Sequence, residues 1–280
     1  MTYDEVLKSA RGNMGPYCKV CPVCNGAACK NQMPGPGAKG VGDNAVRNYQ
    51  KWQEIRVNMD TIHENKPIDT SVELFGRTFK YPFFAGPVGA MTLHYGEKYD
   101  DLAYNNLLVD ACAKGGIAAF TGDGTNAKVM EGATAAIKAA GGLGIPTVKP
   151  WNLETIREKM ELVKASGSFA VAMDIDGAGV PFIIKGIMTR RGALKAKDAG
   201  AAAIVVSNHG GRVLDQCPAT AEVLEDIVEA VGGRMKILVD GGLRSGVDVF
   251  KALAMGADGV LLGRPFVTAV YGGAAEGVQC

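Results

Sequence analysis

The sequence has almost no excess of either charge and no long hydrophobic run. Thirty Lys and Arg residues stand against 29 Asp and Glu residues, so the formal net charge is +1. This balance gives no electrostatic reason to expect binding to nucleic acid or to an acidic membrane surface. No apolar stretch reaches the roughly 18 residues that a membrane-spanning helix needs. The opening residues, MTYDEVLKSARG, lack an apolar signal core, so we expect a cytoplasmic protein.

Histidine is scarce, with only three residues, whereas glycine is abundant, with 38. The chain has 280 residues, of which 47% are hydrophobic, so it can bury a full core. An α/β barrel of about 250 residues often forms one domain. The many glycines suit tight turns between strands and helices.

A regular rhythm of short apolar runs and longer amphipathic stretches begins near residue 83. This alternation is typical of βα units on a parallel sheet. Eight such units predict a (β/α)8 TIM barrel. A doubly wound open sheet is the alternative, but it would normally show fewer strands and an early GxGxxG fingerprint. The predicted strands cover residues 83–90, 116–121, 145–149, 169–176, 181–185, 202–207, 236–240 and 259–263.

Two places do not suit a complete barrel. Only about four residues, 177–180, separate the fourth and fifth predicted strands, whereas a parallel crossover needs about a dozen or more. The sequence also stops at Cys280, before a full eighth helix is expected to form. Our hypothesis is that residues are missing at 177–180 and after Cys280.

Polar residues gather at the ends of the predicted strands, where the active sites of such barrels lie. His209 follows the sixth strand, and a neutral imidazole can take a proton near pH 7. Arg212, three residues further on, offers a planar fork suited to a carboxylate. Lys185 ends the fifth strand and could form a Schiff base or stabilise a developing anion. These residues predict a reaction at an anionic small molecule.

Glycine-rich turns after the seventh and eighth strands predict a phosphate site. Loops at these positions form the usual phosphate site of this fold. Glycine N–H groups can approach a phosphate closely, a helix start adds its dipole, and arginines add charge-assisted hydrogen bonds. The candidate phosphate ligands are Gly241, Gly242, Arg244 and Arg264.

Three motifs are long and specific: PFIIKGIMT at 181–189, VSNHGGRVLDQCPAT at 206–220, and VDGGLRSGVDVFKALAMGADGVLLGRP at 239–265. They resemble the FMN-dependent α-hydroxy acid oxidase and dehydrogenase family, which includes glycolate oxidase and lactate oxidase. A weaker match covers residues 49–91. Together the matches extend over most of residues 45–270.

The resemblance implies FMN as the cofactor and oxidation of a 2-hydroxy acid, lactate-like by default, to the 2-oxo acid. His209 would remove the proton from the substrate carbon or from its hydroxyl as hydride moves to the flavin. Arg212 would bind the substrate carboxylate, and Lys185 would stabilise the reduced ring. Flavin contacts would come from Pro87, Val88, Gly89 and Ser207, and phosphate contacts from Asp240, Gly241, Gly242, Arg244, Gly263 and Arg264.

Three substrate positions depart from the family pattern, and one of them, the N-terminal substrate tyrosine, is not evident here. The family's third strand usually ends in Gln-Leu-Tyr, whose tyrosine helps to hold the substrate, but Lys149 stands near that position here. The family's second substrate arginine is missing from Asp174–Gly177 after the fourth strand. Either Lys149 replaces part of the carboxylate clamp, or the substrate differs from a simple 2-hydroxy acid. Oxygen or another electron acceptor would complete the reaction, and the family suggests a homo-oligomer, often a tetramer.

Four of the seven cysteines lie in a distinct N-terminal segment, residues 1–50, that precedes the FMN-binding barrel of residues 51–280. Their spacing is C-x₂-C-x₂-C-x₄-C, and the first three match the spacing of bacterial ferredoxin loops, so four thiolates could hold an iron–sulfur cluster. A Cys₄ zinc site and a loop of reduced thiols are the alternatives. The candidate metal ligands are Cys18, Cys21, Cys24 and Cys29.

Two further functions fit part of the sequence. An FMN-dependent isomerase would use the same kind of barrel but bind a diphosphate, and the pairing of His209 with Arg212 argues against it. A redox or metal-binding module would rely on the cysteine cluster, with the barrel as its scaffold.

Overall fold

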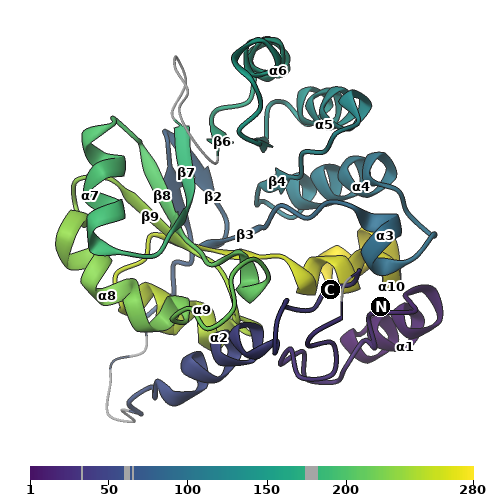
Figure 1. Cartoon of the computed structure of the whole chain (residues 1–280), viewed down its shortest axis with the longest axis horizontal. Coiled ribbons are helices and arrows are strands. Elements are labelled where there is room, and N and C mark those ends of the chain that lie inside the picture. The colour runs from purple at the N-terminus through teal and green to yellow at the C-terminus, as the bar shows by residue number, and fades with distance from the viewer. Residues whose placement is uncertain (33, 60–63, 65, 174–181) are drawn as a thin grey trace.

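Eight parallel strands close into a barrel in the computed structural model (Figure 1), which confirms the predicted (β/α)8 fold. The structure describes residues 1–32, 34–59, 64, 66–173 and 182–280. The strands follow one another around the barrel in chain order, and β10 pairs with β3 to close it. They are β3 (Phe83–Ala85), β4 (Ala119–Thr121), β5 (Gly144–Val148), β6 (Val171–Met173), β7 (Phe182–Ile187), β8 (Ala203–Val206), β9 (Lys236–Val239) and β10 (Gly259–Leu262).

The barrel strands are apolar on both faces because each lies between the barrel interior and the outer helices. All four residues of β8, the sequence AIVV, are buried. One group of side chains, including Phe84, Phe120, Ile183 and Val205, forms a core of residues drawn from successive strands. Such continuous apolar runs are typical of parallel strands that are covered on both sides.

A short antiparallel hairpin precedes the barrel and joins its core. It consists of β1 (Val72–Leu74) and β2 (Arg77–Phe79). The Phe79 ring meets the Phe84 ring edge-on, with centroids 5.1 Å apart. Leu74 and Phe79 are both buried in this core, so the hairpin adds an apolar cover to the barrel.

Helices follow seven of the eight barrel strands within the described residues. Eight residues, 174–181, separate β6 from β7 in the sequence, and the gap predicted at 177–180 lies outside the described residues. No helix in the described part of the chain is long and apolar enough to cross a membrane. The helices are α3 (Met91–Tyr95), α4 (Asp101–Lys114), α5 (Ala127–Ala139), α6 (Leu153–Ser166), α7 (Arg190–Asp198), α8 (Thr220–Val231), α9 (Gly246–Ala254) and α10 (Arg264–Gln279).

A helix follows the last barrel strand, at the place where the sequence analysis expects the chain to stop before a full eighth helix. Helix α10 covers 16 residues, although Gly273 and Ala274 depart from helical backbone angles. It packs against α1 (Tyr3–Asn13) and α4. The Asn13 amide donates to the carbonyl of Tyr271 at 3.2 Å, and the buried Tyr271 hydroxyl donates to the carbonyl of Gly96 at 3.0 Å. Apolar packing and these bonds stabilise a helix that its glycines alone would disfavour.

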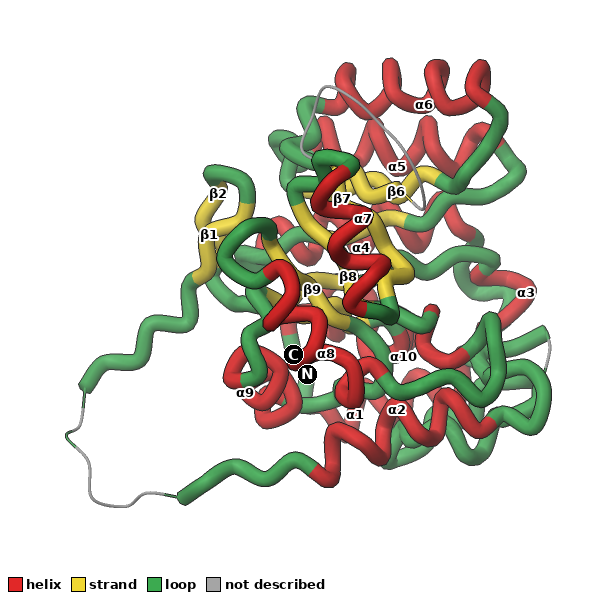
Figure 2. The backbone as a smooth tube through the Cα atoms, turned by 60° about the vertical axis from the view of Figure 1, so that its left-hand side comes forward, coloured by secondary structure: helices red, strands yellow, loops and turns green. Residues whose placement is uncertain are grey.

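The N-terminal segment packs onto the end of the barrel where the strands finish. Helix α2 (Asp43–Glu54) crosses residue 50, the predicted boundary, and contacts α8 and α9, while α1 lies along α10 (Figure 2). The Trp52 indole is fully buried, and its Nε1 donates to the carbonyl of Gly241 at 3.0 Å. The segment therefore forms part of the wall around the mouth of the barrel.

Candidate active site

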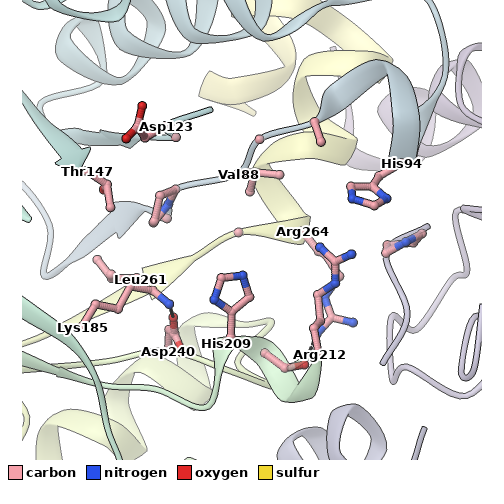
Figure 3. Close-up of a pocket in the computed structure, with 18 of the residues that line it drawn as sticks. Val88, His94, Asp123, Thr147, Lys185, His209, Arg212, Asp240, Leu261 and Arg264 are labelled. Atoms are coloured by element: carbon pink, nitrogen blue, oxygen red, sulfur yellow. Dashed lines mark hydrogen bonds and ion pairs between the residues drawn. The ribbon is translucent and has the colours of Figure 1, made fainter. Parts of the chain in front are cut away.

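A cavity of about 500 Å³ opens at the carboxyl ends of the strands (Figure 3). It brings together residues that the sequence distributes over nearly 230 positions, from Pro36 in the N-terminal segment to Arg264 at the start of α10. All the predicted substrate and cofactor residues line it except Ser207, which lies beneath Lys185. The predicted residues in the lining are Pro87, Val88, Gly89, Lys149, Lys185, His209, Arg212, Asp240, Gly241, Gly242, Arg244, Gly263 and Arg264.

Lys185, Ser207 and Asp240 form one charged cluster on the cavity floor. The Lys185 ammonium donates to Ser207 Oγ at 3.0 Å and lies 3.4 Å from Asp240 Oδ2. The lysine side chain is 8% exposed, so its charge is held close to the cavity with little competing water. A fixed cation at this point can stabilise negative charge that develops on a bound ring.

His209 stands on a turn whose geometry depends on a pair of asparagines. Its backbone has a left-handed φ of 58°, which is uncommon for a residue other than glycine. The side chains of Asn48 and Asn208 bond reciprocally, at 2.6 and 2.8 Å, and Asn208 Oδ1 also accepts from the N–H of Gly211 at 2.9 Å. Helix α2 thereby holds the turn from outside. The sequence analysis missed Asn48, because nothing local connects it to a turn 160 residues away.

The protein environment keeps the His209 imidazole neutral at ordinary pH. The residue lines the cavity and is exposed to water there, although protein groups lie close around its imidazole. Burial, followed by the positive charge of Lys185, lowers the pKa of His209 to about 4, although Asp240 acts in the opposite direction. A neutral imidazole has a nitrogen that can accept a proton. The geometry therefore supports His209 as a proton acceptor.

The end of the cavity near α9 and α10 is built for an anion. Gly242 has a φ of 91°, and a Cβ there would lie 2.1 Å from the backbone oxygen of Asn48, so only glycine fits. Within the described residues, Arg244 Nη2 and Arg264 Nη1 are buried side-chain donors without a hydrogen-bond partner. Buried polar groups are normally satisfied, and orphaned guanidinium nitrogens in a cavity indicate an anionic ligand.

Arg212 lies in the lining as predicted, but it also holds the N-terminal segment. Its Nη2 donates to the carbonyl of Gly35 at 2.7 Å and its Nε to the carbonyl of Gly37 at 3.3 Å. Burial lowers the pKa of Arg212, but the group remains a cation. Arg212 thus links the loop around residues 35–37 to the cavity in which it was expected to bind a carboxylate.

His94 joins this loop from the other side. It is buried and lines the cavity. Its Nδ1 accepts a hydrogen bond from the N–H of Gly35 at 2.8 Å, and burial lowers the pKa of His94. His94 therefore makes a structural hydrogen bond, in a position that sequence patterns did not indicate. The third histidine, His63, lies outside the described residues.

Asp123, which was not among the predicted site residues, organises the opposite wall. Its side chain is fully buried and accepts from Lys159 Nζ at 2.6 Å, Trp151 Nε1 at 2.6 Å and the N–H of Lys149 at 3.0 Å. These bonds fix the loop after β5, including the backbone of Lys149. An acid in the turn TGDGT, just after a strand, was the available signal.

The four N-terminal cysteines line a second cavity, of about 260 Å³. No three Cys, His, Asp or Glu side chains in the described part of the chain lie close enough together to share one metal ion, so the predicted metal is not confirmed. Burial raises the pKa of the Cys18 thiol to about 11. Burial also acts to raise the pKa of Cys24, but the guanidinium groups of Arg264 and Arg244 outweigh it and the pKa is lowered.

The profile of one protein family matches nearly all of the barrel. It is the FMN-dependent dehydrogenase family, which matches residues 36–180 and 176–280. The four clustered cysteines lie before residue 36, outside the matched range.

Curated relatives match over a shorter stretch. A peroxisomal (S)-2-hydroxyacid oxidase of Arabidopsis thaliana is 58% identical over 98 residues, which are 35% of this chain and 26% of that protein. An L-lactate oxidase of Lactobacillus jensenii is 49% identical over 113 residues, which are 40% of this chain and 28% of that protein. The matched stretch is thus little more than a quarter of each relative's length.

Solved structures resemble the whole chain. A mandelate oxidase variant with 2-hydroxy-phenylacetamide superimposes with a TM-score of 0.79 at 25% identity, covering 99% of this chain and 89% of that one. A second mandelate oxidase variant, with a monooxide FMN adduct, gives a TM-score of 0.73 at 27% identity, covering 89% of this chain and 87% of that one.

Proposed function

The chain belongs to the family of FMN-dependent dehydrogenases, and from this premise we propose that it oxidises a 2-hydroxy acid to the 2-oxo acid. One observation carries the proposal: a neutral histidine and several fixed cations meet in a single cavity of about 500 Å³. A base and a set of cations are what removal of a proton from an anionic hydroxy acid requires. The names of the relatives, which are oxidases of 2-hydroxy acids, support the same reaction.

The residues present fit FMN. Arg244 and Arg264 have buried nitrogens without partners at the end where the phosphate is expected, and Asp240 Oδ1 is an unpartnered acceptor that suits ribityl hydroxyls. Thr147 Oγ1, at the end of β5, is likewise buried without a partner beside the cavity. Lys185 would lie against the ring, where a fixed cation favours its reduced form. FMN, when bound, supplies a two-electron acceptor for the substrate hydride.

The protein's own residues would bind the substrate and move its proton. His209 would accept that proton, since its imidazole is neutral at ordinary pH. Arg212 and Lys149, both in the lining, would supply positive charge to the carboxylate. The bonds of Arg212 to Gly35 and Gly37 make the loop around residues 35–37 part of the substrate site.

The acceptor, the assembly and the location belong to the same proposal. The electron acceptor is oxygen, as the names of the oxidase relatives suggest, or another acceptor. We also propose a homo-oligomer in the cytoplasm. Light scattering of the purified protein measures its oligomeric state, and fractionation of source cells measures its location.

An anaerobic spectrum tests the proposed reaction. The purified yellow protein is mixed without oxygen with L-lactate, glycolate or L-mandelate, and flavin absorbance is followed. We expect at least one acid to bleach the flavin and to yield its 2-oxo acid in equal amount. A protein with full FMN occupancy that no 2-hydroxy acid bleaches would refute the proposal.

A further inference from the structure

The four clustered cysteines are free thiols that line one shared cavity. We propose that Cys18, Cys21, Cys24 and Cys29 hold an iron–sulfur cluster in this cavity, next to the flavin site. All four are partly buried, and each contributes to the lining of the same space of about 260 Å³. Thiolates from one short segment around a single space are the usual means of holding such clusters.

The cavity suits a cluster better than a single zinc ion. Tetrahedral zinc binds each thiolate at about 2.3 Å, which would bring the four sulfurs within roughly 4 Å of one another. The described side chains contain no such tight group of ligands. In a cluster the cysteine ligands bind different iron atoms, so the cysteines must surround a cavity large enough for several atoms. The four cysteines form one short C-x₂-C-x₂-C-x₄-C run, whereas zinc sites more often use two separated C-x₂-C pairs, so the spacing favours iron and sulfide.

The cavity wall has the shielding and charge that a cluster requires. Leu7, Met14 and Val20 line it and are buried, so they limit contact with water. Arg244 and Arg264 line it as well, and Arg244 Nε donates to the carbonyl of Cys24 at 2.7 Å. A cluster with four thiolate ligands is anionic, and these two cations would offset its charge.

The same two arginines connect this cavity with the flavin site. Arg244, Arg264, Pro36 and Tyr95 line both cavities, so a cluster would be separated from the phosphate end of the flavin site by a single layer of side chains. A role in electron transfer follows, and it rests on the proposed oxidation. Each 2-hydroxy acid loses two electrons and two protons. The electrons would leave one at a time through the cluster to two molecules of a one-electron carrier protein, and the protons would pass to solvent.

The chain offers a matched control for the ligands. Cys217 is a free, partly buried cysteine outside the cavity lining. Wild type, Cys24→Ser, Cys29→Ser and Cys217→Ser are purified anaerobically with FMN, and iron, zinc, acid-labile sulfide and FMN are measured per chain. We expect equal iron and sulfide, at two or four per chain, in wild type and Cys217→Ser. Both Cys24→Ser and Cys29→Ser should lose most of the iron and sulfide but keep FMN, which shows that they fold.

Several results would overturn the site. One is wild-type protein with full FMN that contains neither iron nor sulfide, even after reconstitution with ferrous iron and sulfide. Another is one zinc per chain without sulfide. Equal loss of iron from Cys217→Ser would also remove the assignment.

Electron paramagnetic resonance separates the cluster from the proposed oxidation. In wild type, dithionite and the best of the three acids should each produce the signal of a reduced cluster. In His209→Gln only dithionite should do so. A cluster that dithionite reduces but no acid reduces would leave the site in place and refute the electron route. Flavin bleaching by an acid in a protein without iron would refute the cluster and leave the oxidation standing.

Discussion

The two halves of the barrel mouth handle their buried charges in opposite ways. The half that follows β7, β8, β9 and β10 leaves polar atoms unsatisfied, among them Asp240 Oδ1, Arg244 Nη2 and Arg264 Nη1. The half that follows β4 and β5 places Asp123 with four donors, including the buried Lys159 ammonium. The first half has bonding capacity left for a ligand, whereas the second uses its charges to fix its own loops.

This difference assigns a separate task to each half. Unpartnered buried charges cost free energy unless a ligand satisfies them, so the half with orphaned charged groups is the one expected to hold the phosphate end of the cofactor. The half whose charged groups are satisfied sets the shape of the opening and the position of Lys149. Substitutions in the first half should therefore lower the catalytic rate or the affinity for the cofactor. Substitutions in the second half should lower the stability of the protein or its affinity for the substrate.

The largest effect is expected at the base. His209→Gln should lower kcat by about 10²–10⁴-fold, because the proton loses its acceptor, while flavin absorbance stays unchanged. Steady-state kinetics with the best 2-hydroxy acid measure it. His94→Gln, which alters the other cavity histidine, is the control and should change kcat only a few-fold. Equal losses in both variants would show that His209 has no special role.

Asp123→Ala should be the most destabilising change in the other half. It leaves the buried Lys159 ammonium without its partner, which costs about 3–5 kcal/mol of unfolding free energy. Urea unfolding measures the loss. Glu161→Ala, which removes an exposed partner of Lys164, is the control on the same side of the barrel and should cost less than about 1 kcal/mol. An Asp123→Ala protein as stable as this control would mean that the buried pair does not stabilise the wall.

Arg264→Met should weaken FMN binding. Loss of a charge-assisted hydrogen bond costs about 1.5–3 kcal/mol, or roughly 10- to 150-fold in Kd. Fluorescence titration of the flavin-free protein measures Kd for FMN and for riboflavin, which lacks the phosphate. Riboflavin binding should hardly change. If both ligands weaken equally, Arg264 does not bind the phosphate.

The neutral state of His209 makes stability depend on pH. Its pKa is about 4 in the folded protein and about 6.5 in the unfolded chain, so between these values only the unfolded chain binds the proton. Stability should therefore fall as pH drops from about 6.5 towards 4. Because water reaches the imidazole, we expect the unfolding free energy to be lower by only about 1 kcal/mol at pH 5. The unfolding free energies of flavin-free wild type and His209→Gln are compared at pH 5 and pH 8 to isolate this contribution. If both proteins lose the same stability between the two pH values, His209 makes no such contribution.

Lys149→Met should have the smallest effect. It removes one positive charge from the opening, so KM for a 2-hydroxy acid should rise about threefold while kcat stays constant. This pattern indicates the loss of an interaction that binds the substrate and the transition state equally well. Lys138→Met, an exposed change on α5, is the control. An unchanged KM in Lys149→Met would leave Arg212 as the proposed carboxylate ligand.

The barrel and half of its mouth could be predicted from the sequence because their signals are local. Apolar runs gave the eight strands, and glycines beside arginines at strand ends gave the anion site. Asn48, His94 and Asp123 could not be found in this way. Each acts through partners far away in the sequence, such as Asn208, which lies 160 residues from Asn48.

The sequence by itself determined the fold class and the side chains at the strand ends, because strand periodicity and turn composition depend on neighbouring residues. Only the tertiary structure decided how these side chains are satisfied. It placed Arg212 against the N-terminal loop, left Arg244 and Arg264 with unpartnered nitrogens, and brought the four cysteines around one cavity beside them. Such relations depend on which distant segments pack together, and that is fixed by the folded core as a whole.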